Sequence, residues 1–165
     1  MRNVALCIIL LTACSEWSRA DYRDWCELDE LIDRIGLDAV PTGDGVICAQ
    51  IEAPADGNYT PDEGLSDFAD NFIWKRSGNS GPSSHATNVA RKFYGNEQSL
   101  APDIWLVNCW EVNDWLQNGF LRVGQGSANA PQYTGLGIIK VWNHSWVGTF
   151  NNTNTDHDAL RRVDW

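Results

Sequence analysis

The sequence has few basic residues and none of the cysteine patterns that hold metals. Lysine and arginine together number 12 against 22 aspartates and glutamates, which gives a formal net charge of -10 at pH 7. Nucleic-acid binding needs a basic face, so this balance argues against a nucleic-acid partner. No C-x-x-C pair occurs, and no cysteine lies at a zinc-site spacing from a histidine. We therefore predict neither a metal site nor a cofactor.

The apolar run at the amino end is too short to span a bilayer. Arg2 supplies a positive start, and residues 4–11 are apolar throughout. This pattern predicts a secretory signal peptide. The segment ends in Leu11-Thr12-Ala13-Cys14, which resembles the bacterial lipobox. The resemblance implies that residues 1–14 form a signal with a lipobox, and that Cys14 becomes the lipidated first residue.

We therefore expect an exported lipoprotein, held at a membrane of the bacterial cell envelope by acyl chains on Cys14. The alternative is ordinary signal cleavage a few residues later, which gives a soluble secreted product. Residues 15–35 are expected to form a tether and an N-terminal helix. The sequence leaves the oligomeric state open.

The remaining composition indicates one folded domain. The chain has 165 residues, of which 43% are apolar, so general disorder is excluded. Three cysteines follow the lipobox, and an odd number cannot pair completely. Cys48 and Cys109 lie in apolar, strand-like runs, so we expect buried free thiols.

Hydrophobic periodicity predicts strands that alternate with helices. Helical spacing from Trp25 to Ile35 predicts a helix that stops at Gly36, and a second stripe over 86–93 predicts a helix capped by Ser83 or Ser84. This alternation is typical of an α/β fold with a parallel sheet. The predicted strands cover residues 46–51, 72–74, 104–109 and 138–142.

The last predicted helix starts at Asp156 and runs to Trp165. It feeds no further strand, so we expect a fold that is incomplete at the C-terminus.

Two side chains at strand and helix ends form a candidate catalytic pair. Glu52 ends the first buried strand, and His85 opens a helix after a loop. Sites in parallel sheets form at the carboxyl ends of the strands. An acid that orients an imidazole, and an imidazole that takes a proton from a hydroxyl, make two thirds of a hydrolytic triad.

Four segments, in the same order along the chain, resemble subtilisin-like serine peptidases, the subtilases. The first resembles the strand that ends in the catalytic acid, and the second resembles the start of the catalytic-histidine helix. The third resembles the Ala-Pro and strand that follow, and the fourth resembles the strand that lines the substrate groove. The segments are Gly43–Glu52, Ser84–Ala90, Leu100–Val107 and Val141–Gly148.

The resemblance implies a three-layer subtilisin-like fold over residues 36–165, here a partial peptidase domain. It implies a serine-type endopeptidase that cuts a polypeptide substrate through an acyl-enzyme. His85 would be the general base and Glu52 its orienting acid. The substrate-binding residues implied are Ser145, Trp146 and Gly148.

The sequence also departs from the family pattern. Glutamate replaces the usual aspartate at position 52, Ala86 replaces a glycine, and Asn88 replaces a histidine. Sedolisins use a glutamate in a related fold but lack the histidine. The chain contains no Gly-Thr-Ser turn and no Gly-x-Ser-x-Gly elbow, and the segment that would bring the oxyanion asparagine is absent. We therefore predict that these 165 residues alone have no peptidase activity.

Other interpretations remain open from the sequence. The nine tryptophans are core fillers or, alternatively, a surface on which a non-catalytic lipoprotein binds peptide or glycan. A regulatory pseudo-peptidase is a further alternative. Alternatively, Glu52 is only a surface acid at a strand end. In that case Asp56 or Asp62 would be the acid that pairs with His85. His144 and His157 are expected to be solvated loop residues.

Overall fold

The computed structural model describes residues 26–124 and 138–163 of the chain. The chain divides into two compact units, residues 1–40 and residues 41–165. The predicted signal segment with Cys14 and the first part of the tether lie outside the described residues. None of the helices in the described parts is long and apolar enough to cross a membrane.

The described part of the first unit is one short helix and a turn. Helix α3 (Leu28–Ile35) is followed by the 3-10 turn η1 (Leu37–Ala39). Between them, Gly36 has a φ of 82°, a conformation that glycine adopts without steric cost. The predicted helix stop at Gly36 is therefore confirmed. No residue of α3 is buried.

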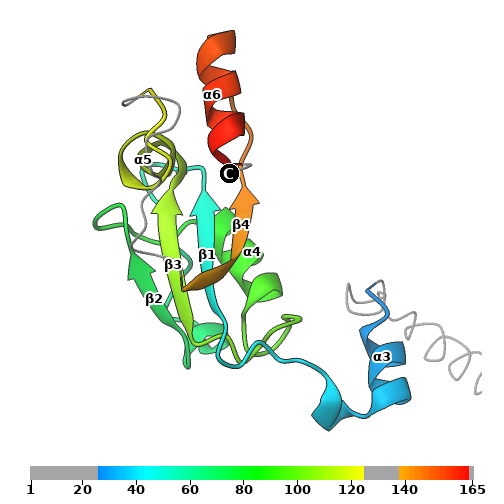
Figure 1. Ribbon diagram of the computed structural model, residues 1–165. Coiled ribbons are helices and arrows are strands. Elements are labelled where there is room, and N and C mark those ends of the chain that lie inside the picture. Colours follow the sequence, from blue (N-terminus) through cyan, green and yellow to red (C-terminus); the bar gives the residue numbers. More distant parts are fainter. Residues whose placement is uncertain (1–25, 125–137, 164–165) are drawn as a thin grey trace, which may run out of the picture. The chain divides into compact units, whose positions relative to one another are not determined.

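The second unit is built on a four-stranded sheet in which every pair of neighbours is parallel (Figure 1). The strand order is β2-β3-β1-β4, so β1 lies inside the sheet and β2 and β4 lie at its edges. This sheet with its helices confirms the predicted α/β class. The strands are β1 (Ile47–Glu52), β2 (Phe72–Lys75), β3 (Leu106–Glu111) and β4 (Ile139–Ser145).

The helices of this unit join consecutive strands or follow the last one. Helix α4 connects the neighbours β2 and β3, and its start is fixed by Ser83, whose hydroxyl accepts a hydrogen bond from the Ala86 amide. This confirms the predicted cap. The helical elements are η2 (Ser66–Phe68), α4 (Ser84–Phe93), α5 (Val112–Asp114), the π-turn η3 (Trp115–Gly119) and α6 (Thr153–Val163).

Several boundaries differ from the sequence prediction, and β3 starts and ends two residues later than predicted. Strand β4 runs three residues past Trp142, because Asn143, His144 and Ser145 pair with β1. The prediction that His144 lies in a loop is therefore wrong, although its side chain is exposed as predicted. Helix α6 begins at Thr153, three residues before the predicted Asp156.

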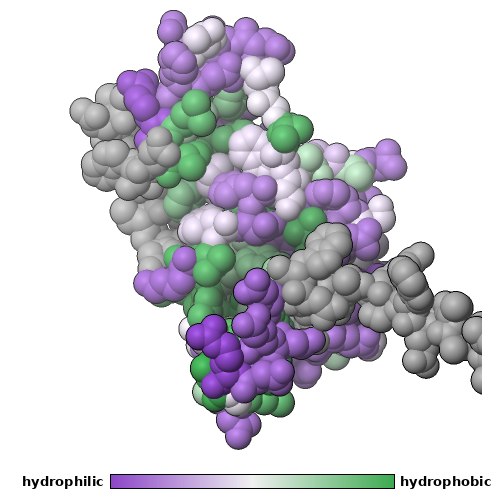
Figure 2. Space-filling model, turned by 90° about the vertical axis from the view of Figure 1, so that its right-hand side faces the viewer, coloured by the Kyte–Doolittle hydropathy of each residue, from purple (hydrophilic) through white to green (hydrophobic). Residues whose placement is uncertain are grey.

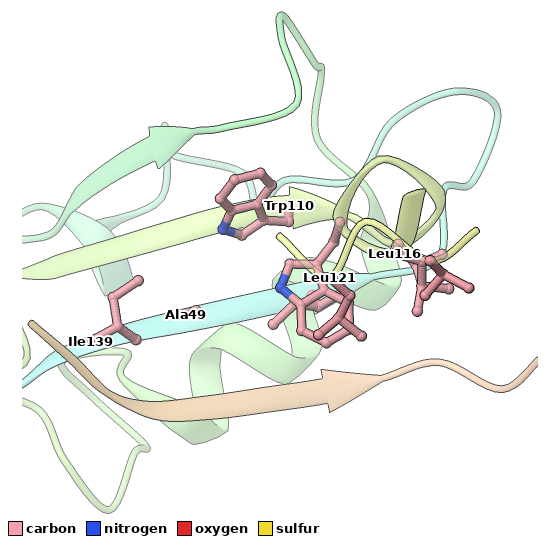
Figure 3. Close-up of a cluster of buried hydrophobic side chains, with 9 residues drawn as sticks. Ala49, Trp110, Leu116, Leu121 and Ile139 are labelled. Atoms are coloured by element: carbon pink, nitrogen blue, oxygen red, sulfur yellow. The ribbon is translucent and has the colours of Figure 1, made fainter. Parts of the chain in front are cut away.

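Each face of the sheet has its own apolar cluster. Side chains alternate along β1, so Ala49 and Ile51 join one cluster and Cys48 joins the other. The first cluster includes Trp110 and Leu116 and is drawn in Figure 3. The second lies under α4, and its members are Cys48, Tyr59, Phe68, Ile73, Ala90, Tyr94, Ile104, Val107 and Cys109.

The described cysteines are all free, and two of them are buried. Cys48 and Cys109 are fully buried free cysteines, which confirms the prediction for both, and Cys26 is free and exposed. On the face drawn in Figure 2, hydrophobic side chains lie in small groups among hydrophilic ones. Scattered groups of this kind are ordinary on a folded domain.

Candidate functional site

The site begins with two side chains that the fold brings together from positions 33 residues apart. Glu52 is the last residue of β1, and His85 is the second residue of α4. The Nδ1 atom of His85 lies 2.8 Å from Oε2 of Glu52. The Glu52 side chain is 0% exposed, whereas that of His85 is 59% exposed. A buried acid thus holds an imidazole whose outer part reaches solvent.

The hydrogen bond fixes the roles of the two imidazole nitrogens. A carboxylate only accepts, so Nδ1 carries the proton and donates it to Glu52. Nε2 of His85 then has a free lone pair, and it makes no hydrogen bond within the described parts of the chain. This is the tautomer that a general base needs.

The electrostatics of Glu52 are set by burial and by two donors. Burial raises the pKa of its carboxyl, because the charged form loses its water. Hydrogen bonds from Gln50 and His85, and the positive charge that His85 can carry, lower the pKa and offset part of that effect. The net shift is upward.

Gln50 is a site residue that the sequence prediction did not identify. Its Nε2 donates to Glu52 Oε1 at 2.8 Å and to the Ala86 carbonyl at 3.0 Å. Its Oε1 accepts from the Tyr94 hydroxyl at 2.5 Å. The available signal was one polar residue inside a buried strand, two positions before the acid and hence on the same face.

Strand register places two further polar residues beside Glu52. Glu111 ends β3 and Ser145 ends β4, and both are Cα partners of Glu52. The Glu111 carboxylate accepts from the amides of Asn113 and Asp114, so it caps α5. The Ser145 hydroxyl accepts from Asn143 Nδ2 at 2.8 Å. Neither side chain is hydrogen-bonded to the Glu52–His85 pair in the described structure.

Trp146 and Gly148 line a cavity of about 550 Å³ instead. The cavity lies between the segment that follows β4 and helices α5 and α6, and Leu116 and Leu160 contribute to its wall. Trp146 also packs against the apolar cluster that contains Ile51. The structure therefore brings Trp146 and Gly148 together, and it places Ser145 on the Glu52 side of the sheet.

The hydrogen bond of His85 also excludes the two alternative acids that the sequence offered in place of Glu52. The acid that bonds its imidazole is Glu52, so Asp56 and Asp62 do not take that place. One oxygen of Asp62 accepts from the Gly64 amide at 3.1 Å. In the described residues, no group of three or more histidines, cysteines or acids could hold a metal ion.

The remaining histidines lie away from this pair. His144 stands edge-on to the Trp115 ring, with 4.7 Å between the ring centroids, and Trp146 Nε1 donates to its Nδ1 at 3.1 Å. Burial lowers the pKa of His144. His157 is exposed as predicted, but it lies on α6 and not in a loop.

Comparison of the chain with protein-family models, with curated proteins and with solved structures found no match.

Proposed function

We propose that Glu52 and His85 are the acid and the general base of a hydrolytic triad, in a subtilisin-like serine peptidase. The observation that carries this proposal is the 2.8 Å contact between Nδ1 of the exposed His85 and the fully buried Glu52. This pair presents an unprotonated Nε2, with its lone pair free to accept a proton, to solvent from a buried anchor.

The chemistry follows from that arrangement. Nε2 of His85 takes the proton of a serine hydroxyl as the oxygen attacks a peptide carbonyl, and it then gives the proton to the leaving amine. Glu52 keeps the imidazole in the Nδ1–H tautomer and stabilises the imidazolium that forms. An acyl-enzyme results, which water hydrolyses with the same histidine as base.

The positions of the two residues support the family assignment. The acid ends an inner parallel strand, and the histidine begins the helix between the next two strands. This acid-then-histidine order matches the first two members of the subtilisin order acid, histidine, serine. The segment from Ser145 to Gly148 begins at the end of a neighbouring strand, and we propose that a polypeptide substrate lies along it. Lipidation at Cys14 would place this activity in the bacterial cell envelope.

The serine nucleophile is the part of the proposal that these 165 residues do not supply. The coding sequence beyond codon 165 tests it directly. We expect an open frame with an asparagine-bearing strand and a Gly-Thr-Ser turn before an apolar helix. A stop codon in that position contradicts the peptidase proposal and favours a non-catalytic role.

Activity measurements extend this test. The 165-residue chain should not turn over a fluorogenic peptide, and the chain extended by the downstream frame should. His85→Ala should then abolish turnover, whereas His157→Ala, a change at an exposed histidine of α6, should leave it unchanged. Equal loss in both variants, or none in His85→Ala, counts against His85 as the base.

A second candidate function is binding of peptide or glycan through exposed aromatic rings. Phe72, Trp74 and Trp105 are each about half exposed at the β2 edge, and the Phe72 amide bonds the Trp105 carbonyl. The Trp74 ring also carries the Arg76 guanidinium at 4.0 Å. This function predicts saturable ligand binding that Trp74→Ala weakens and His85→Ala leaves unchanged.

A further inference from the structure

A chain of buried hydrogen bonds lies behind the Glu52–His85 pair. The Tyr94 hydroxyl donates to Gln50 Oε1 at 2.5 Å, and Gln50 Nε2 donates to Glu52 Oε1 at 2.8 Å. The other carboxylate oxygen, Oε2, faces His85. Tyr94, Gln50 and Glu52 are all 0% exposed, so water does not replace any of these bonds.

We propose that Gln50 and Tyr94 are positioning residues for the general base. Gln50 holds one oxygen of Glu52 and so fixes the plane in which the other oxygen meets His85, and Tyr94 determines which way the Gln50 amide points. This inference rests on the proposed function, because it assigns two further residues to the same acid–base pair.

The surroundings of the Gln50 amide allow only one orientation. Its NH2 group lies between two acceptors, Glu52 Oε1 and the Ala86 carbonyl. A flipped amide would turn its oxygen toward both of them and lose both bonds. On the other side, Tyr94 offers a hydroxyl donor, and burial raises the pKa of that phenol well above 10. Tyr94 therefore keeps its hydroxyl proton and remains a donor at neutral pH.

The same bonds tie the acid to the helix that carries the base. Ala86 follows His85 in the first turn of α4, and Tyr94 is the residue that closes the helix at its other end. Gln50 thus contacts both ends of α4 from one position on β1. Any displacement of the helix along the strand that separates His85 from Glu52 would therefore also have to break these bonds.

The need for such a clamp follows from the identity of the acid. Glutamate has one more rotatable bond than aspartate, so more side-chain conformers must be restricted to hold its carboxylate in place. One oxygen of Glu52 is occupied by Gln50, and this fixes the plane of the carboxylate that His85 meets.

Carboxyl titration in the 165-residue chain tests the proposal. The variants are Gln50→Met, which keeps the length and removes the amide, and Tyr94→Phe, which removes only the hydroxyl. Tyr59→Phe is the matched control, because Tyr59 is 2% exposed and its hydroxyl donates to the Gly78 carbonyl at 2.7 Å. Far-UV circular dichroism and thermal unfolding establish that each variant is folded.

The readouts are the 13C titration of the Glu52 carboxyl and the Nδ1 proton resonance of His85. Without the Gln50 donor, the carboxylate loses a bond that favours its charged form, so the Glu52 midpoint should rise by about one unit. Tyr94→Phe should raise it by less, and Tyr59→Phe should not move it. A merely structural role would lower the stability of both tyrosine variants and move no midpoint.

The outcomes separate this inference from the proposed function. A hydrogen-bonded Nδ1 proton in the unaltered chain, lost in Glu52→Gln, establishes the pair. If that proton is present and both Gln50→Met and Tyr94→Phe leave the midpoint unchanged, the positioning proposal is overturned and the pair stands. If the unaltered chain shows no such proton, the proposed acid–base pair itself is contradicted. Should Gln50→Met not fold, Tyr94→Phe decides the question alone.

Discussion

The two faces of the sheet are stabilised in different ways. The face under α4 contains a buried polar chain from Tyr94 through Gln50 to Glu52, among apolar side chains and two thiols. The opposite face contains mainly aromatic and aliphatic side chains around Trp115, with ring centroids 4.6–6.2 Å apart. One face depends on the directions of hydrogen bonds, and the other depends on the filling of space.

This difference shows how one strand can contribute to apolar packing on one face and to a hydrogen-bonded site on the other. Side chains alternate across β1, so Gln50 and Glu52 reach the polar face while Ala49 and Ile51 anchor the strand in the aromatic face. The buried contacts of Ala49 and Ile51 hold the strand in place on the packed face. The polar face can then hold a buried acid in one orientation, although burying such a group costs stability.

The largest effect on stability should come from removing a core side chain of the packed face. Trp115 is 2% exposed and contacts Phe120, Trp142 and His144. We expect Trp115→Ala to lower the free energy of unfolding by about 3 to 5 kcal/mol, measured by urea denaturation. Trp105→Ala is the control, since that ring is 52% exposed, and it should change stability by about 0.5 kcal/mol or less. Equal costs would remove the distinction between core and surface tryptophans.

A smaller effect should follow the loss of the histidine on the packed face. His144 is exposed, but its ring lies edge-on to Trp115 and its Nδ1 accepts from Trp146. His144→Ala removes both contacts, and we expect a cost of about 1 to 2 kcal/mol in the same experiment. A cost near zero would mean that His144 does not contribute to this cluster.

The histidine on the polar face should contribute less to stability. His85→Ala takes one partner from Glu52, but the vacated space is open to water, so we expect a cost of about 1 kcal/mol or less. His157→Ala provides the baseline for removal of an exposed histidine. A larger cost for His85→Ala than for His144→Ala would reverse the comparison between the two faces.

The smallest effect should be the pH dependence, where the two faces act with opposite sign. The pKa of Glu52 is raised above 4.5, so the unfolded chain releases this proton first, and the stability from this group is lost as pH rises from 4.5 through the raised value. The pKa of His144 is lowered below 6.5, so the unfolded chain binds this proton first. Its contribution is lost as pH falls from 6.5 through the lowered value.

Urea titrations at several pH values separate the two contributions. Relative to the unaltered chain, Glu52→Gln should become more stable as pH rises above 4.5, and His144→Gln should become more stable as pH falls below 6.5. Parallel curves for all three proteins would show that neither group titrates differently in the folded and unfolded states.

The sequence allowed prediction of features that depend on local pattern. The parallel α/β class, the stop at Gly36, the cap at Ser83 and the buried thiols all follow from apolar spacing or from one residue type at a helix end. Glu52 and His85 were recognisable because one ends a buried strand and the other begins a helix.

The features that were missed depend on contacts between distant segments. Strand β4 continues through the polar residues Asn143 to Ser145 because β1 supplies their hydrogen-bond partners. His144 lies in a strand and not in a loop for the same reason. The role of Gln50 depends on Tyr94, which lies 44 positions away, and no local pattern shows where an amide points.

The tautomers of His85 and His144 provide the most direct test of the central claim. Two-bond 15N–1H NMR spectra of the labelled chain, recorded where both rings are neutral, identify the protonated nitrogen in each ring. We predict Nδ1–H for His85, which donates to Glu52, and Nε2–H for His144, whose Nδ1 accepts from Trp146. Glu52→Gln should alter the pattern of His85 alone. An Nε2–H tautomer at His85, unchanged in Glu52→Gln, would contradict the account of this site as an acid–base pair.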